Sequence, residues 1–139
     1  TVEQARESES AGSGGAADIA NLSKNVFIIQ KHEARKVCAA VDFVTSVGAY
    51  RGGNSRVEAG IPATQGVTVF TNLCIMKTGA ESGQLELQSL HPGVTIEQLK
   101  ENTGFDLIIP SEYEITPEPD PEYLRVLRTV VDPNKIYIR

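Results

Sequence analysis

The run Val26-Phe27-Ile28-Ile29 constrains the fold of this chain more than its other apolar segments do. It is short, uninterrupted and made of β-branched and aromatic residues, which is typical of a strand buried on both faces in a parallel sheet. Because such strands are covered by helices on both sides, the segment predicts an α/β fold. His32 and Glu33 follow at the strand exit, where open α/β sheets often place functional groups, although a hydrogen-bonded structural histidine is the expected role of His32.

Residues 11–20 combine a glycine-rich turn with the start of a helix that is expected over residues 16–22. Glycine accepts backbone conformations that other residues resist. Such a turn presents free backbone N–H groups and the positive end of a helix dipole, which suits an oxyanion, a phosphate or a thioester carbonyl. The turn lacks the lysine of the nucleotide-triphosphate loop, and its glycine spacing is not the dinucleotide fingerprint. A tight turn that binds nothing is the alternative interpretation.

Composition narrows the classes of function. The chain has 139 residues and a net charge of −5, which argues against a nucleic-acid partner because phosphate binding needs clustered Lys and Arg. No apolar run approaches the roughly 20 residues of a membrane span, and no secretory signal is visible. Cys38 and Cys74 lie in apolar stretches and indicate buried, unreactive thiols in a reducing cytoplasm. His32 and His91 alone do not form a metal site, and we expect no metal.

The remaining segments predict alternating strands and helices. Thr95-Ile96-Glu97-Gln98 is a capping box that begins a helix, which is expected to end near Thr103 with Gly104 as a left-handed cap. Asp120 and Pro121 begin a last helix after an extended acidic connector over residues 110–121. Residues 46–66 form a long loop in which Arg51 and Arg56 are expected to be solvated charges. Further strands are expected at residues 37–45, 67–76, 85–89 and 107–109.

Several segments together resemble one family, the family I CoA-transferases, in the carboxy-terminal half of the β subunit. The glutaconate and 3-oxoacid CoA-transferases are the types that the chain resembles. The order and spacing of the segments also match, and the resemblance covers nearly the whole chain from about residue 11. The segments are Gly12-Ser13-Gly14-Gly15-Ala16-Ala17-Asp18, Lys31-His32-Glu33, Val69-Phe70-Thr71-Asn72-Leu73, Leu90-His91-Pro92-Gly93-Val94-Thr95, Glu101-Asn102-Thr103-Gly104-Phe105 and the tail from Leu124 to Arg139.

The resemblance implies a three-layer α/β/α fold with a mostly parallel, mixed sheet. It implies a reaction that moves CoA from an acyl-CoA to a carboxylic acid through a glutamyl-CoA thioester, with the thioester as substrate and no permanently bound cofactor. It also implies a partner α subunit. Glycine-rich turns line the substrate pocket of this family, so the expected substrate-binding residues are Gly12, Ser13, Gly14, Gly15 and Ala16.

The chain departs from the family pattern in one respect. The nucleophilic glutamate of such β subunits lies well upstream of the glycine turn, and nothing here matches it, so we expect no catalytic residue in this chain. Because the chain starts at Thr1 and not at Met, we expect a processed or cut piece. Residues 1–10 would be a mobile arm or cut edge, and residues 11–139 the carboxy-terminal part of the β-subunit domain. The isolated chain would then be inactive without the missing amino-terminal part.

Two other functions remain open from the sequence. Some relatives of these β subunits are CoA-dependent hydrolases that open carbon rings, and the absent glutamate region is what would separate them from transferases. A non-catalytic structural or docking subunit is the third hypothesis, in which the apolar strands bury surface against a partner.

Overall fold

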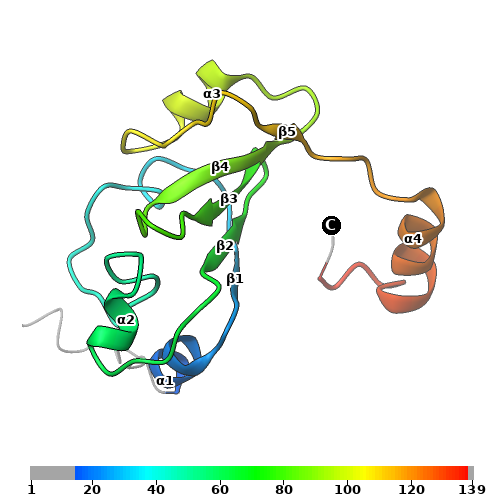
Figure 1. Ribbon diagram of the computed structural model, residues 1–139. Helices are drawn as coiled ribbons and strands as arrows, with labels where there is room; N and C mark the ends of the chain where they lie inside the picture. Colours follow the sequence, from blue (N-terminus) through cyan, green and yellow to red (C-terminus); the bar gives the residue numbers. More distant parts are fainter. Residues whose placement is uncertain (1–14, 138–139) are drawn as a thin grey trace, which may run out of the picture.

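The structure is a computed structural model that describes residues 15–137, and it is built on a five-stranded sheet with short helices around it (Figure 1). The elements follow the chain as α1 (Ala16–Leu22), β1 (Val26–Ile29), α2 (Ser55–Glu58), β2 (Val67–Phe70), β3 (Cys74–Thr78), β4 (Leu85–Leu90), α3 (Ile96–Glu101), β5 (Glu114–Ile115), α4 (Pro121–Val126) and the π-helical turn η2 (Leu127–Val131).

The sheet has the strand order β1-β2-β3-β4-β5. The outer pairs β1–β2 and β4–β5 are parallel, while β2–β3 and β3–β4 are antiparallel. The predicted mixed sheet of an α/β fold is therefore confirmed. The antiparallel strand expected at residues 85–89 is also confirmed, as β4.

The core lies where α3 packs on the middle of the sheet. Met76, Leu99 and Cys74 are fully buried, and Val37, Val69, Leu87 and Leu90 complete the cluster. Met76 and Leu99 thus join β3 to α3, and their burial is the apolar contribution that holds the helix in place.

The amino-terminal cap of α3 is the predicted capping box. Thr95 Oγ1 accepts from the Gln98 N–H at 3.2 Å, and Gln98 Oε1 accepts from the Thr95 N–H at 3.0 Å. The predicted left-handed cap at Gly104 is wrong. Gly104 is required instead by a close approach, because a Cβ built on it would lie 2.7 Å from the Ala34 carbonyl oxygen.

Two predicted strands are wrong in extent. Residues 37–45 contain no strand and pair only through one parallel bridge between Cys38 and Gly104. The strand predicted over residues 67–76 divides into β2 and β3 at a tight turn. Thr71 makes that turn, since its Oγ1 accepts from the N–H groups of Leu73 and Cys74 at 3.1 and 3.0 Å. A side chain that satisfies backbone donors locally favours a turn over a continued strand.

The extended acidic connector contains a short strand, β5. Thr116 N–H donates to the Leu90 carbonyl oxygen at 2.8 Å, and Glu114–Ile115 pairs parallel with β4. The strand expected at residues 107–109 is reduced to one bridge, between Ile108 and Glu86. Pairing with β4, and not local composition, therefore decides that residues 114–115 form a strand and that residues 107–109 form only a bridge.

The prediction for β1 is correct in its span and wrong in its burial. β1 pairs with β2 on one side only, at the edge of the sheet. Phe27, Ile28 and Ile29 are 67%, 40% and 86% exposed. A strand that looks from sequence like the middle of a parallel sheet is its edge in this chain.

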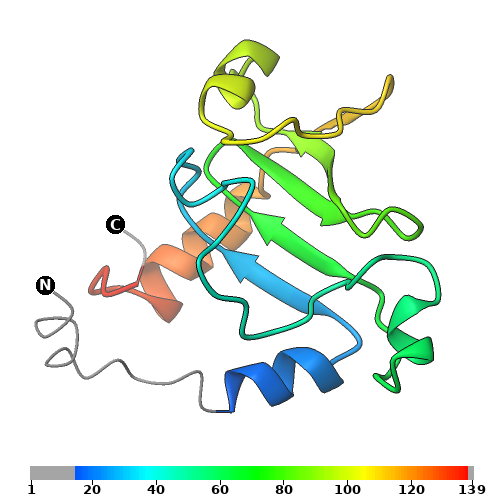
Figure 2. The ribbon, with the colours of Figure 1, turned by 90° about the vertical axis from the view of Figure 1, so that its left-hand side faces the viewer.

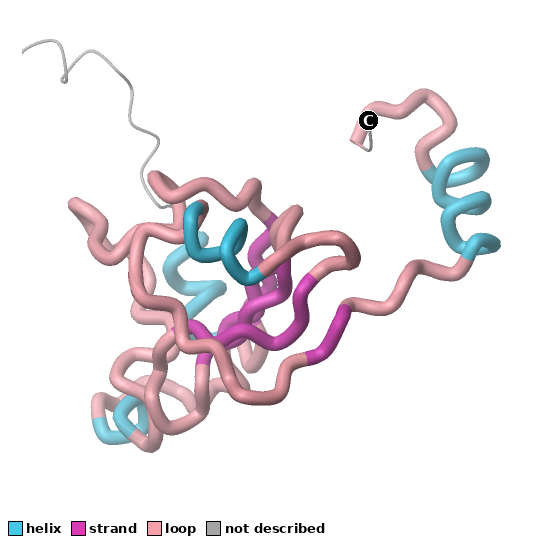
Figure 3. The backbone as a smooth tube through the Cα atoms, turned by 90° about the horizontal axis from the view of Figure 1, so that it is seen from above, coloured by secondary structure: helices cyan, strands magenta, loops and turns pink. Residues whose placement is uncertain are grey.

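The last helix begins as expected. Asp120 Oδ1 accepts from the Glu122 N–H at 2.7 Å, and Pro121 occupies the first helical position. Figures 1 and 3 both show α4 standing apart from the sheet. Neither α4 nor η2 has a buried residue; Leu124 and Leu127 are half-buried, and Val131 is exposed. No helix in this described part is long and apolar enough to cross a membrane.

Candidate functional site

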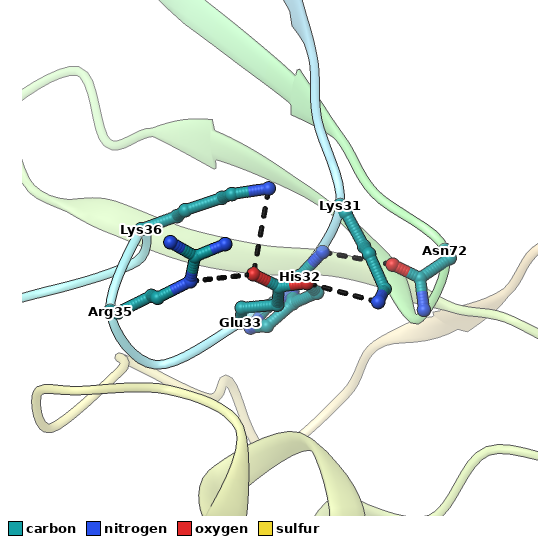
Figure 4. A network of polar contacts seen from close by, with 6 residues as sticks. All are labelled: Lys31, His32, Glu33, Arg35, Lys36 and Asn72. Atoms are coloured by element: carbon teal, nitrogen blue, oxygen red, sulfur yellow. Dashed lines mark hydrogen bonds and ion pairs between the residues drawn. The ribbon is translucent and has the colours of Figure 1, made fainter.

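The carboxyl ends of the parallel strands β1 and β2 lie side by side and carry most of the polar residues of interest. β1 is followed by His32, and β2 by Thr71 and Asn72. The His32 backbone N–H donates to Asn72 Oδ1 at 2.8 Å, which joins the two strand exits (Figure 4). Ligands of open α/β sheets bind outside the carboxyl ends of parallel strands, so this edge is the candidate site.

The ring of His32 is buried, 2% exposed, and both of its nitrogens are hydrogen-bonded. Nε2 lies 3.0 Å from Thr103 Oγ1, and Nδ1 lies 3.1 Å from Thr71 Oγ1. Thr103 Oγ1 donates its own proton to the Leu99 carbonyl oxygen at 2.7 Å. It can therefore only accept from the ring, which assigns the ring proton to Nε2.

Thr71 lies on the other side of the ring. Its Oγ1 accepts two backbone N–H groups, from Leu73 and Cys74, so both of its lone pairs are occupied. Its proton is then free to go to His32 Nδ1. The Cys74 carbonyl oxygen, 3.0 Å away, is a second acceptor for that proton, because a carbonyl oxygen has two lone pairs and the Thr71 N–H occupies only one. The neutral tautomer of His32 is therefore assigned by Thr103, and the Thr71 contact is compatible with it.

Burial acts on the pKa values of His32 and Cys74 so that both groups stay uncharged. It lowers the pKa of His32 and raises the pKa of the Cys74 thiol, partly opposed by the hydrogen bond from Thr71. The Cys74 sulfur lies 3.8 Å from His32 Nδ1, so the two neutral groups are adjacent. Cys74 is the buried, unreactive thiol that the sequence predicts, whereas Cys38 is only half-buried.

His91 extends the network across the sheet. Its Nε2 lies 2.9 Å from the Thr71 carbonyl oxygen, which can only accept, so Nε2 carries the proton. Nδ1 then accepts from Thr116 Oγ1 at 2.8 Å, and Thr116 accepts from Ser89 Oγ at 2.7 Å. His91 begins the turn that precedes α3. The structure adds a link from that turn to both the β2–β3 hairpin and the end of β5.

A charged cluster surrounds Glu33 at the exit of β1 (Figure 4). Its carboxylate lies 2.9 Å from Lys31 Nζ, 3.0 Å from Arg35 Nε and 3.5 Å from Lys36 Nζ. Hydrogen bonds from Lys31 and then Arg35 lower the pKa of Glu33 to about 2. Three cations against one carboxylate leave this edge positive in an acidic chain. The sequence signal that could have found the cluster is the density of basic residues in 31–36.

The predicted substrate-binding turn is only partly within the described residues. Gly12, Ser13 and Gly14 lie outside them. Gly15 and Ala16 are exposed at the start of α1, and Gly15 has an ordinary φ of −73°. Figure 2 shows α1 running antiparallel to β1, so the amino-terminal end of α1 lies toward the side where β1 ends.

The prediction that Arg56 is a solvated charge is wrong, since the side chain is buried. Its guanidinium donates to the carbonyl oxygens of Pro62 at 2.9 Å, of Asn21 at 2.5 Å, and of Gly48. Asn21 belongs to the last turn of α1, where unpaired carbonyls and the negative helix end attract a cation. Arg51 does remain exposed, with its guanidinium 5.3 Å from the Tyr50 ring. Arg56 therefore holds the long loop against α1.

A cavity of about 420 Å³ lies beside this loop, lined by residues that include Gly52, Arg56 and Lys77. Gly66, which directly precedes β2, also lines this cavity. The cavity therefore lies at the amino end of β2, away from the candidate edge. Within residues 15–137 no group of three His, Cys, Asp or Glu side chains could hold a metal ion.

The fold is an α/β domain whose polar edge, the candidate site, lies at the exits of two parallel strands. The family model for coenzyme A transferase matches residues 1–102, and the chain belongs to this family. The resemblance to CoA-transferase β subunits is thereby confirmed.

Individual relatives agree with the family assignment. The chain is 40% identical over 119 residues to the β subunit of 3-oxoadipate CoA-transferase from Pseudomonas knackmussii, covering 86% of this chain and 46% of that protein. It is 35% identical over 129 residues to the β subunit of glutaconate CoA-transferase from Acidaminococcus fermentans, covering 92% and 48%. The chain thus spans just under half the length of these relatives.

Solved structures show the same fold. Glutaconate coenzyme A-transferase of Acidaminococcus fermentans superimposes with a TM-score of 0.81 at 35% identity, over 93% of this chain and 49% of that one. IpdAB of Rhodococcus jostii RHA1 superimposes with a TM-score of 0.72 at 29% identity, over 91% and 50%.

Proposed function

We propose that this chain is the carboxy-terminal part of a CoA-transferase β subunit, which moves CoA between an acyl-CoA and a carboxylic acid. The observation that carries the proposal is the match, over most of the chain, to two β subunits that are named CoA-transferases, one of them with a closely similar structure. In this proposal residues 11–139 are the carboxy-terminal part of the β-subunit domain.

The proposed reaction divides the labour between this chain and the rest of the complex. A glutamate carboxylate from outside the chain attacks the thioester carbon and expels CoA thiolate, which leaves an acyl-glutamyl anhydride. The thiolate then attacks the glutamyl carbonyl, so that the glutamyl-CoA thioester forms and the first acid departs, and the second acid collects the CoA by the reverse steps. Each attack places negative charge on a carbonyl oxygen, which backbone N–H donors stabilise. We assign that task to the turn Gly12-Ser13-Gly14-Gly15-Ala16. The exposure of Gly15 and Ala16 and the direction of α1 support the assignment.

The buried edge gives this site a rigid base. Neutral His32, held between Thr71 and Thr103, fixes the exits of β1 and β2 and the α3 end relative to one another. A binding site needs such support, since misplaced donors lose most of their effect. In this proposal His32 is a positioning residue and not a proton carrier, because its pKa is lowered by burial.

The proposal includes partners and a compartment. The partners are a CoA-transferase α subunit and the remaining part of the β subunit, and the isolated chain is inactive without them. No resident cofactor is needed, because the CoA thioester is itself the substrate. We place the complex in the cytoplasm, which suits the free thiols of Cys38 and Cys74.

Trapping the covalent intermediate tests the proposal. The intact complex is incubated with an acyl-CoA and then with borohydride, which reduces a glutamyl thioester to an alcohol that mass spectrometry locates. The modified glutamate should lie in the polypeptide that accompanies this chain. A complex that transfers CoA normally without any trapped glutamate would contradict the mechanism.

A ring-cleaving hydrolase is the second candidate function. The similarity to the solved IpdAB structure favours it, and the IpdB subunit of Rhodococcus jostii is named a cholesterol ring-cleaving hydrolase. This candidate requires hydrolysis of the CoA ester of a cyclic ketone with no acceptor acid and no trapped thioester. If a complex rebuilt with its full partners shows neither activity, the chain is a structural or docking subunit.

A further inference from the structure

The charged cluster around Glu33 is not used by the network that holds His32. Its three cations, Lys31, Arg35 and Lys36, have side chains that are 69%, 79% and 39% exposed. Exposed ion pairs contribute little to the stability of a fold. Residues 31–36 nevertheless hold three of the chain's 13 lysines and arginines, and no other six-residue window holds three. Since stability does not explain this concentration, contact with an anion is the role that its charge supports.

The geometry of the cluster holds two cations side by side and leaves most of their donors free. Lys31 Nζ lies 2.9 Å from Glu33 Oε1, and Arg35 Nε lies 3.0 Å from Glu33 Oε2 (Figure 4). Within residues 15–137 Arg35 is bonded only through Nε, which leaves its two terminal nitrogens as free donors. A lysine ammonium has three donors, and Glu33 takes one of them. Free donors of this kind bind phosphate oxygens.

The charge of the chain makes such a local patch necessary for an anionic substrate. CoA carries a diphosphate and a 3′-phosphate, whereas the chain has a net charge of −5. An acidic protein repels a polyanion unless the ligand meets positive charge where it binds. Three cations against one carboxylate supply that positive charge at the exit of β1.

We propose that Lys31 and Arg35 bind the phosphate groups of CoA, with Glu33 as the positioning residue that holds the two cations together. CoA carries its phosphates at the end opposite its thiol, so their site lies beside the reacting centre and not within it. The cluster follows β1, and the amino-terminal end of α1, which carries part of the proposed oxyanion turn, lies toward the same side (Figure 2). The inference rests on the proposed function only for its ligand, and it applies equally to a hydrolase of CoA esters.

The test measures the affinity of the intact complex for CoA by isothermal titration calorimetry, so that no turnover is needed. K31Q/R35Q removes the two proposed contacts. K24Q/R51Q is the matched control, because Lys24 and Arg51 are also an exposed lysine and an exposed arginine, and Lys24 precedes the opposite end of β1. We expect the Kd for CoA to rise about ten-fold or more in K31Q/R35Q and less than about two-fold in the control.

Fragments of CoA identify the phosphate that the cluster binds. Pantetheine has no phosphate, so its Kd should be the same for K31Q/R35Q and the parent complex. Dephospho-CoA lacks only the 3′-phosphate. An effect that disappears with dephospho-CoA assigns the cluster to the 3′-phosphate, and an effect that persists assigns it to the diphosphate. Because salt screens exposed charge pairs, higher ionic strength should weaken CoA binding more in the parent than in K31Q/R35Q. Far-ultraviolet circular dichroism checks that both variants keep the fold.

Three results would overturn the inference. One is an unchanged Kd for CoA in K31Q/R35Q. Another is equal weakening in K31Q/R35Q and K24Q/R51Q, which would show an effect of overall charge alone. The third is equal weakening of CoA and pantetheine, which would show a disturbed site and no phosphate contact. CoA binding that depends on the cluster, without any CoA transfer, would leave the inference standing and count only against the proposed function. Normal transfer with an unchanged Kd in K31Q/R35Q would count only against the inference.

Discussion

Replacing Thr103 by valine tests the hydrogen bond that holds His32 in its neutral form. Valine has nearly the shape of threonine, so T103V removes one hydroxyl and opens no cavity. The hydroxyl receives His32 Nε2–H at 3.0 Å and donates to the Leu99 carbonyl oxygen at 2.7 Å. That carbonyl keeps a second donor, the Asn102 N–H at 3.2 Å. The ring N–H is left as the one buried donor without a partner.

An unsatisfied buried donor costs about 1–3 kcal/mol. We therefore expect T103V to lower the free energy of unfolding by about 2 kcal/mol, measured by urea titration at pH 7.5. Thr129 offers a matched control, because its hydroxyl also donates to the carbonyl four residues earlier, at 2.8 Å, but is exposed and contacts no histidine. T129V should change the free energy by less than about 0.5 kcal/mol.

The comparison of the two variants decides the interpretation. If T103V and T129V lose the same stability within about 0.5 kcal/mol, the His32–Thr103 bond contributes nothing measurable and the assigned tautomer has no energetic support. A loss in T103V that exceeds about 4 kcal/mol would also refute the reasoning, since one orphaned donor cannot account for it.

Three further predictions concern pH, backbone and catalysis. Because burial lowers the pKa of His32 from 6.5, the unfolded chain binds a proton that the folded chain does not, so stability present above pH 6.5 should fall as the pH is lowered to 5.5. Urea titrations should show this loss in the parent protein and a smaller one in H32Q, while Glu33, with a pKa of about 2, stays ionised throughout. Gly52 and Gly60 both have left-handed φ values, +74° and +76°, but only at Gly52 would a Cβ meet backbone, 2.2 Å from the Glu81 carbonyl oxygen. G60A should cost about 1–2 kcal/mol by thermal or urea unfolding and G52A about 1–3 kcal/mol more, and equal losses would show that the loop moves to accept the methyl group. In the full complex, G14V should reduce turnover by a factor on the order of 10²–10³ with little loss of stability, whereas normal turnover per folded molecule would mean that the turn is structural only.

The parts of the fold that the sequence predicts correctly are those with local causes. The capping box at Thr95 and Gln98, the aspartate cap and proline of α4, and the strand propensity of β1 all involve neighbours along the chain. Each depends on groups within about four residues, so its geometry follows from the residue types. The family resemblance succeeds for a related reason, since it depends on the order of short motifs.

The sequence predicts the candidate site less completely, because the bonds of the site join distant segments. His32 meets Thr71 and Thr103, which are 39 and 71 residues away along the chain. Nothing in the sequence near Thr103 indicates that its hydroxyl receives a histidine. The burial of Arg56 is not predictable from the sequence for the same reason: its guanidinium donates to the carbonyl oxygen of Asn21, which lies 35 residues earlier.

The sequence alone determined where helices α1, α3 and α4 begin and that residues 26–29 form a strand. The tertiary structure decided which apolar segments became strands. Residues 114–115 pair with β4 although they lie in the acidic, proline-rich connector, while the apolar residues 37–45 form no strand. The physical reason is that a helix satisfies its hydrogen bonds within one segment, whereas a strand needs donors and acceptors from another.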